Sequence, residues 1–313
     1  MKYIWTMLLG ISLLSSCSKD IKVESLEQLN ITLDQAKLVG DSYQFKLGDT
    51  VKFLMTGKAD NITFYSGETG KNYSNATRVS GIGKTLLSLT SSVTSGSQTN
   101  TLKVYAINKL EKLDYDFINT ANWTDITSKV SLATSSTAVN ATDIDISDII
   151  TSAADSLFIA FKYTGTTGSA QRTWTITNLT LTNLLPDGTR SPLLTLANDA
   201  NFWTRVKSPT SPASWTPSSS QLQIVGGAAS AASNVSWIVS RALDVKRVTP
   251  DLPTVLKHLG SEIPNFFSGG KNIDGHTYIY SKPGKYKATF VAFNTSIDRS
   301  ESVLKEFNIE ILP

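Results

Sequence analysis

The residues with the clearest chemical potential in this chain of 313 residues are two tryptophans. Trp203 and Trp215 flank a segment that contains Pro209 and Pro212, and Pro217 follows. Because proline punctuates loops and interrupts strands, the pattern favours tryptophans on loops. A loop tryptophan presents a flat apolar ring on which the CH face of a sugar can stack. The pair therefore predicts a glycan-binding surface, and packing beneath the loop is the alternative.

Other residues extend this predicted surface. Arg205 lies between the two tryptophans and can donate hydrogen bonds to sugar hydroxyls. Trp123 follows a polar segment and fits either a core or a surface. Trp174 and Trp237 lie within alternating apolar segments, which predicts core positions for both.

Tyr65 and Tyr73 belong to the stretch FYSGETGKNY, residues 64–73. Its apolar start followed by Gly-Glu-Thr-Gly predicts a strand end and a turn, because glycine tolerates backbone angles that other residues resist. We expect a structural corner in which Phe64 and one tyrosine pack inward. A ligand-facing Tyr65 or Tyr73 is the alternative.

Residues for catalysis are scarce. His258 and His276 have no metal-ligand partner at the right spacing, so both are expected on the surface. Glycosidases use two carboxylates, which sequence alone cannot pair here, and no G-x-S-x-G motif occurs. We expect no enzyme, no catalytic residue and no cofactor. The acidic run 143–148 alternates with isoleucine and lacks the EF-hand glycine and glutamate, so it predicts a strand edge. A structural calcium ion there stays open.

The N-terminus has the features of an export signal. Residues 1–16 carry Lys2 and then an apolar run too short to span a bilayer as a helix. Leu14-Ser15-Ser16-Cys17 resembles the bacterial lipobox, which implies a lipid attached to Cys17, the chain's only cysteine. Two or three acyl chains anchor a protein stably in a membrane. An ordinary cleaved signal with an incidental thiol is the alternative.

Ser18-Lys19-Asp20 is similar to the export signal of Bacteroidota surface lipoproteins. This resemblance implies an outer-membrane, lipid-anchored and cell-surface-exposed protein. The net charge is +3, and Lys and Arg are scattered along the chain, so nucleic acid is not an expected partner.

The rest of the chain has the period of two that is typical of strands. Apolar and polar residues alternate over 51–56, 102–106, 173–177, 286–293 and 307–311. Residues 157–163 form a nearly continuous apolar run, as in a strand buried within a sandwich. The sequence predicts an all-β fold, with a helical turn expected only near 147–154.

The ends of the chain resemble one domain. YSKPGKYKATFVAFNTS (280–296) and VLKEFNIEIL (303–312) look like the closing strands of a PKD-type, immunoglobulin-like domain. GDTVKFLMTGKADNITFYSGETGKNY (48–73) resembles its opening strands. The resemblance implies a discontinuous Ig-like sandwich, at 18–110 plus 275–313. The remainder resembles a jelly-roll, galactose-binding-like carbohydrate-binding module at 111–250, with a connecting loop at 251–274.

The whole pattern is similar to Bacteroidota surface lipoproteins encoded beside SusC/SusD-like glycan-uptake pairs. The segments that carry this resemblance include LFIAFKYTG, RTWTITNLTL and VSWIVSRALDVKRVTPD. It implies a protein that binds a polysaccharide or oligosaccharide without cleaving it, as an accessory to a SusC/SusD-like complex. A structural or adhesive lipoprotein that binds a protein partner is the alternative, and a jelly-roll hydrolase is a third.

Overall fold

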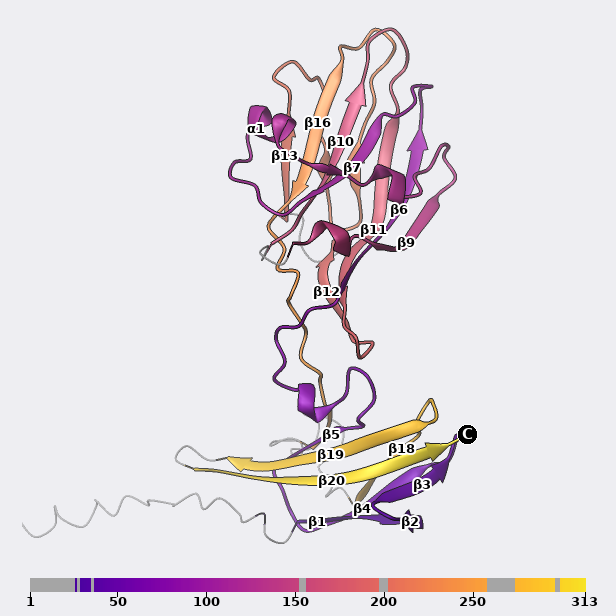
Figure 1. Ribbon diagram of the computed structural model, residues 1–313, viewed down its shortest axis with the longest axis vertical. Helices are drawn as coiled ribbons and strands as arrows, with labels where there is room; N and C mark the ends of the chain where they lie inside the picture. Colours follow the sequence, from indigo (N-terminus) through magenta and orange to yellow (C-terminus); the bar gives the residue numbers. More distant parts are fainter. Residues whose placement is uncertain are drawn as a thin grey trace, which may run out of the picture. The chain divides into compact units, whose positions relative to one another are not determined.

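The chain is all-β and divides into two compact units (Figure 1). The computed structural model describes residues 26, 29–34, 37–151, 156–196, 202–257, 274–295 and 299–313. The first unit combines the N-terminal chain up to Tyr73 with the C-terminal chain from Leu252, and the second unit is Ser74–Asp251. The export signal, Cys17 and His258 lie outside the described residues.

The first unit is an Ig-like sandwich of two sheets. One sheet has the strand order β1-β4-β18, and the other has the order β17-β5-β19-β20-β3-β2. Strand β20 pairs with β3 in parallel, and the other pairings of the unit are antiparallel. The strands are β1 (Asn30–Asp34), β2 (Lys37–Val39), β3 (Ser42–Lys46), β4 (Val51–Thr56), β5 (Asn61–Tyr65), β17 (Thr254–Lys257), β18 (Gly275–Tyr278), β19 (Gly284–Thr295) and β20 (Ser300–Leu312).

The core of the first unit follows from the alternation in its strands. In β4 every second side chain is buried, which places Val51, Phe53 and Met55 between the sheets. Phe53 packs against Phe64 of β5 and Phe290 of β19, with ring centroids 5.6 and 4.9 Å apart. The two ends of the chain therefore share one core, which is why neither end could close a sandwich alone.

The stretch FYSGETGKNY forms the predicted structural corner. Phe64 and Tyr65 are buried, whereas Tyr73 is 37% exposed and meets Tyr65 edge-on. Gly67 has a φ of +85°, and a Cβ there would lie 2.7 Å from the backbone of Lys287. The expectation that Phe64 and one tyrosine pack inward is confirmed, and the burial of Tyr65 contradicts its ligand-facing role.

His276 does not lie on the surface, as the sequence suggested, because β18 carries it into the aromatic core. Its ring lies 4.6 Å from that of Phe64 and is half-buried, and its Nε2 has no hydrogen-bond partner among the described residues. This burial lowers the pKa of His276 from its usual 6.5, since the charged form loses hydration.

The first unit is therefore expected to lose stability as the pH falls through about 6.5, because the unfolded chain then binds a proton that folded His276 resists. Urea unfolding between pH 8 and 5.5 measures this dependence. His276→Phe should flatten it, since phenylalanine fits an aromatic cluster and does not titrate. An equal slope in both proteins would contradict the role of His276.

The second unit is a jelly-roll-type sandwich. One sheet has the order β13-β16-β10-β7-β8, and the other has β14-β15-β11-β6-β9, with β12 also paired to β11. Figure 1 shows them as two facing layers. The elements are β6 (Lys84–Thr94), β7 (Leu102–Ile107), α1 (Tyr115–Thr120), β8 (Thr124–Asp125), β9 (Val139–Asp145), β10 (Phe158–Gly165), β11 (Thr173–Leu184), β12 (Arg190–Thr195), β13 (Trp203–Lys207), β14 (Thr216–Pro217), β15 (Leu222–Ile224) and β16 (Asn234–Ser240), with 3-10 turns η2 (Tyr73–Asn75), η3 (Thr127–Lys129) and η4 (Ser147–Ile149).

The predicted boundaries between the two units are wrong in two places. Strand β6 pairs with β11 and β9, and β7 pairs with β10 and β8, so residues 74–110 belong to the second unit. Strand β17 pairs with β5, so the expected connecting loop 251–274 contains a strand of the first unit. Alternation identifies a strand but not its partner, and so it could not place these boundaries.

The outer face of one sheet in the second unit is covered by α1, which the sequence did not predict. Asp114 caps this helix by accepting a hydrogen bond from the Phe117 N–H, and Ile118 packs on Trp237 and Val239. The predicted helical turn at 147–154 is found as η4. Among the described residues, no helix has the length and apolarity needed to cross a bilayer.

Candidate functional site

The tryptophans expected to form a glycan platform belong to the core. Trp203 is 6% exposed in β13, and Trp215 is fully buried beside Phe161, with ring centroids 6.3 Å apart. Strand β13 pairs along its length with β16, and that pairing turns Trp203 inward. The prediction that these two rings are free for sugar stacking is wrong, because the proline-rich segment covers the sandwich rather than standing away from it.

The other residues of that predicted surface do not come together either. Trp123 is half-buried and stacks on Trp237 on the outer face of the sheet, with centroids 5.6 Å apart. Arg205 is exposed on β13, and Tyr65 and Tyr73 lie in the first unit. Trp174 and Trp237 are buried, as predicted.

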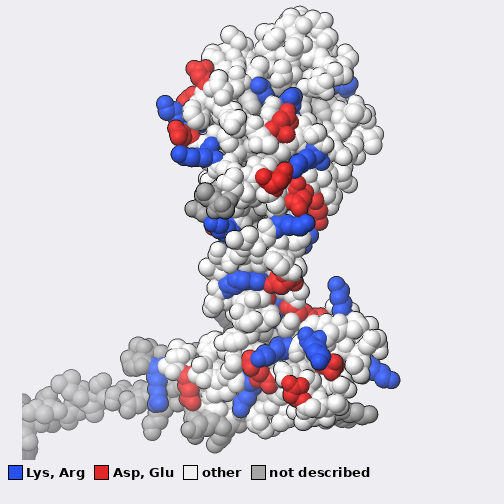
Figure 2. All heavy atoms as spheres, viewed as in Figure 1, with Lys and Arg blue, Asp and Glu red and all other residues white. Residues whose placement is uncertain are grey.

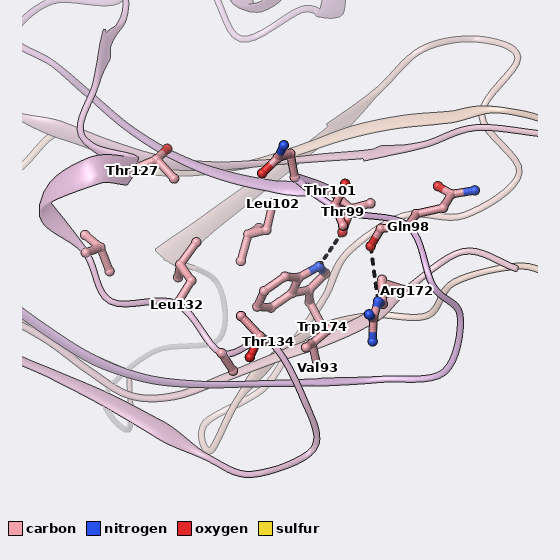
Figure 3. Close-up of a pocket in the computed structure, with 13 residues that line it drawn as sticks. Val93, Gln98, Thr99, Thr101, Leu102, Thr127, Leu132, Thr134, Arg172 and Trp174 are labelled. Carbon is pink, nitrogen blue, oxygen red and sulfur yellow. Dashed lines mark hydrogen bonds between the residues drawn. The ribbon is translucent and has the colours of Figure 1, made fainter. Parts of the chain in front are cut away.

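A different ring lines a hollow in the second unit. The hollow has a volume of about 320 Å³, and Figure 3 shows the indole of Trp174 within it, with Leu132 on one side and Arg172 on the other. We call it the Trp174 hollow. Its apolar lining is Val93, Leu102, Val130, Leu132, Ala133 and Trp174, and its polar lining is Gln98, Thr99, Asn100, Thr101, Thr127, Thr134 and Arg172.

Three separate segments build the Trp174 hollow. They are the β6–β7 connection with its flanking strand ends, the segment from η3 to Thr134, and residues 172–174 at the start of β11. Strand β11 lies beside β6, with Thr173 opposite Thr94 and Trp174 opposite Val93. The hollow therefore opens at the end of the sandwich where β6 finishes and β11 begins.

The β6–β7 connection is held in one shape by its backbone and by Gln98. Ser95, Gly96 and Asn100 all have positive φ angles, of 57°, 58° and 52°. The Gln98 amide donates to the carbonyls of Thr166 and Ser169 at 2.6 and 2.9 Å, and its oxygen accepts from the Thr166 N–H at 3.0 Å. The rim is thus tied to the β10–β11 connection, which crosses from one sheet to the other, before any ligand arrives.

Trp174 is oriented by a buried hydrogen bond. Its Nε1 donates to Thr101 Oγ1 at 2.8 Å, as the dashed line in Figure 3 shows. Trp174 is 6% exposed, so part of its ring borders the hollow while the rest packs in the core. The arrangement offers a fixed aromatic edge rather than an open platform.

Arg172 is positioned by its backbone and by its side chain. Its carbonyl accepts from the Tyr163 hydroxyl at 2.8 Å, and burial raises the pKa of Tyr163 to about 12, so this phenol stays protonated. The Arg172 Nε donates to the Gln98 carbonyl at 3.1 Å. The guanidinium is therefore held at the rim of the hollow.

A second hollow, also of about 320 Å³, lies at the FYSGETGKNY corner. Glu68 lines it and accepts hydrogen bonds from Ser281 and from the hydroxyls of Ser66 and Tyr278. Burial alone would raise the pKa of the Glu68 carboxyl, but these hydrogen bonds outweigh burial and the pKa is lowered. Glu68 is thus engaged in closing the corner, which favours a structural role there.

The acidic run 143–148 forms ion pairs rather than a metal site in the described chain. Asp145 lies 3.3 Å from Lys84, Asp148 lies 2.6 Å from Lys129, and Asp143 pairs with Arg190. No group of three potential metal ligands occurs among the described residues. Each carboxylate thus has a basic neighbour where a calcium ion would need it as a ligand.

On the face drawn in Figure 2, basic and acidic residues are interspersed, and the end of the second unit drawn uppermost is almost entirely uncharged. Strands β6 and β10 run toward that end in Figure 1. Threonine, serine and asparagine dominate the sequence of the β6–β7 connection, SGSQTNT (95–101). Such a surface interacts through hydrogen bonds more than through charge.

Comparison with known proteins places the chain by family. Residues 16–202 match the family described as a domain of unknown function, DUF5017, and this match covers more than half of the chain and reaches into both units. Searches of curated proteins and of solved structures gave no match. The chain belongs to the DUF5017 family.

Proposed function

We propose that this protein binds glycan without cleaving it, and that the sugar enters the Trp174 hollow. The observation that carries the proposal is the hollow itself, a preformed cavity with an aromatic edge, an apolar wall and a rim of hydroxyl and amide groups. Small-ligand sites combine apolar walls with a few placed polar groups, over roughly 300–1,000 Å³. At about 320 Å³ the hollow suits one end or one branch of a glycan rather than a long stretch.

The rim supports recognition of sugar hydroxyls. Thr99, Asn100 and Thr134 are exposed and line the hollow, so their side chains can exchange water for ligand hydroxyls. The apolar wall, which includes Leu102 and Leu132, can receive the CH face of a sugar ring. Because the rim is already ordered, binding costs little conformational entropy.

Binding rather than cleavage fits the chemistry of the lining. Arg172 is the one ionisable side chain among the described residues that line the hollow. Hydrolysis of a glycosidic bond in most glycosidase families uses a pair of carboxyl groups on either side of that bond. The described lining supplies hydrogen-bond donors and acceptors instead.

We place this activity at the cell surface, on a lipid anchor at Cys17, as an accessory to a SusC/SusD-like uptake complex. The lipobox-like Leu14-Ser15-Ser16-Cys17 and the following Ser18-Lys19-Asp20 support the placement. A tether at the N-terminal end leaves the second unit available to extracellular polysaccharide. Protease added to intact cells should digest the protein, and full protection would contradict this placement.

Blocking the hollow tests the proposed function. Thr99→Leu combined with Thr134→Leu adds apolar bulk at two exposed lining positions and should weaken glycan binding by about tenfold or more, since rim hydrogen bonds are lost. The control, Thr137→Leu with Thr210→Leu, changes two exposed threonines outside the lining and should leave affinity unchanged.

The measurement is calorimetric titration with a panel of polysaccharides, followed by oligosaccharides of each polysaccharide that binds. Binding that survives the blocked hollow would move the site elsewhere. Binding of no glycan would overturn the proposal in favour of an adhesive role, and release of shortened products would restore the hydrolase alternative.

A further inference from the structure

The Trp174 hollow carries positive charge and no negative charge in its described lining. Arg172 contributes a permanent positive charge, and among the described residues no carboxylate lines the hollow or pairs with this guanidinium. Four other basic residues of the second unit, Lys84, Lys103, Lys129 and Arg190, each contact an aspartate. Arg172 therefore differs from them in facing a cavity instead of an acid.

The hydrogen bond made by Arg172 leaves its outer edge available. Its Nε is engaged with the Gln98 carbonyl at 3.1 Å, which fixes the plane of the guanidinium. Its Nη1 and Nη2 make no hydrogen bond or ion pair with a described residue. These two groups point the same way, and together they match the two oxygens of a carboxylate or two oxygens of a sulfate.

The aromatic edge and the cation come from the start of β11 and the residue just before it. Arg172 and Trp174 are two residues apart, so both side chains lie on one face of the chain entering β11 (Figure 3). A sugar ring against the apolar wall would carry an acidic substituent toward Arg172. Partial burial strengthens such a pair, because fewer waters compete for the guanidinium.

We propose that the Trp174 hollow is selective for acidic sugars, and that an oxyanion on the sugar ring pairs with Nη1 and Nη2 of Arg172. This inference rests on the proposed glycan binding and adds the ligand class. A neutral sugar leaves the cation unpaired in the hollow, whereas a uronate satisfies it. Selectivity therefore comes from the one charged group in the described lining.

The experiment compares matched ligands on the purified full-length protein by calorimetry. The probes are galacturonic acid oligosaccharides, the same oligosaccharides with their carboxyl groups reduced to alcohols, and sulfated galactose oligosaccharides. The acidic oligosaccharides should bind about 10- to 100-fold more tightly than the reduced ones, since charge-assisted hydrogen bonds are stronger than those of a neutral hydroxyl. Added salt should reduce the difference in affinity between the acidic and the reduced oligosaccharides, because it screens the ion pair.

Two variants separate the role of Arg172 from a general loss of fold. Arg172→Gln should remove the preference for acid and leave the affinity for the reduced oligosaccharide within about twofold. Arg172→Lys should keep part of the preference, because lysine retains the charge but not the planar pair of donors. Arg205→Gln removes an exposed arginine outside the hollow and should change nothing.

The outcomes distinguish this inference from the proposed function. Equal affinity for acidic and reduced oligosaccharides, or an equal loss of both in Arg172→Gln, would overturn the acidic-sugar inference while glycan binding stands. An absence of binding to every glycan would overturn both. Tight binding of the sulfated probe alone, lost in Arg172→Gln, would support the oxyanion pairing and assign it to sulfate.

Discussion

Replacement of Trp215 by alanine is expected to lower the free energy of unfolding of the second unit by about 3–5 kcal/mol. Trp215 is fully buried, packs near Phe161, and donates from Nε1 to the Ser236 carbonyl at 3.3 Å. Truncation removes this apolar contact and this hydrogen bond, and it leaves a cavity between the sheets. No ligand is needed to explain the loss.

Urea unfolding followed by circular dichroism measures the effect. Trp215→Phe keeps much of the ring volume and should cost clearly less than Trp215→Ala. Trp123→Ala provides a comparison, because Trp123 is half-buried on the outer face rather than between the sheets. At a temperature where the variants are folded, Trp215→Phe should bind glycan like the unchanged protein. If Trp215→Ala had normal stability but did not bind glycan, the result would contradict a core role for Trp215 and indicate a ligand-facing one.

The burial of Trp215 could not be predicted from the sequence around it. The prolines around Trp203 and Trp215 correctly indicate interrupted structure, since β13 ends at Lys207 and β14 is short. They do not indicate which way a ring turns, because that depends on β16 pairing alongside β13. Burial is decided by contacts distant in sequence, and loop composition carries little of that information.

The strands themselves were readable from local pattern. In β4 the alternation gives the buried face directly. In β11 it runs through Trp174 and Ile176, shifts at the irregularity around Asn178, and resumes at Leu179 and Leu181. The assignment of β6 and β7 to the wrong unit arose from the same source. An alternating pattern predicts that one face of a strand is buried, but it does not indicate which sheet covers that face.

The Trp174 hollow was only partly visible in the sequence. The spacing of two residues between Arg172 and Trp174 places a cation and an indole on one face of an extended chain, and this signal is present in the sequence. The opposite wall comes from 127–134, which no local pattern connects with β11. Alternation correctly predicted burial of Trp174, yet a ring that is mostly buried can still border a cavity with its remaining edge.

The second large effect is expected at Gly96, in the rim of the hollow. A Cβ built at this position lies 2.2 Å from the Ala170 carbonyl oxygen and 2.6 Å from the Gln171 carbonyl carbon. Both are backbone atoms, so no side-chain rotation can relieve the clash. Gly96→Ala should therefore push the β6–β7 connection away from the β10–β11 connection and lower the free energy of unfolding by roughly 3 kcal/mol.

Gly168→Ala is the matched control. Gly168 also has a positive φ, of +104°, but a Cβ there would meet no atom within 4 Å. The control therefore reports backbone strain of roughly 1 kcal/mol without the clash. Urea unfolding of both variants isolates the contribution of the close approach, and equal destabilisation would show that the rim tolerates a side chain at Gly96.

Glycan binding by the Gly96→Ala variant tests whether the shape of the rim controls the affinity of the Trp174 hollow. The Ser97 N–H donates to the Ala170 carbonyl at 3.2 Å, and Gln98 presents to Arg172 the carbonyl that fixes its guanidinium. Displacement of this connection should loosen Arg172 and separate the polar rim from Trp174. We expect folded Gly96→Ala to bind acidic oligosaccharides at least about tenfold more weakly, whereas Gly168→Ala binds them normally. Unchanged affinity in a destabilised Gly96→Ala would mean that the shape of this rim does not govern the site.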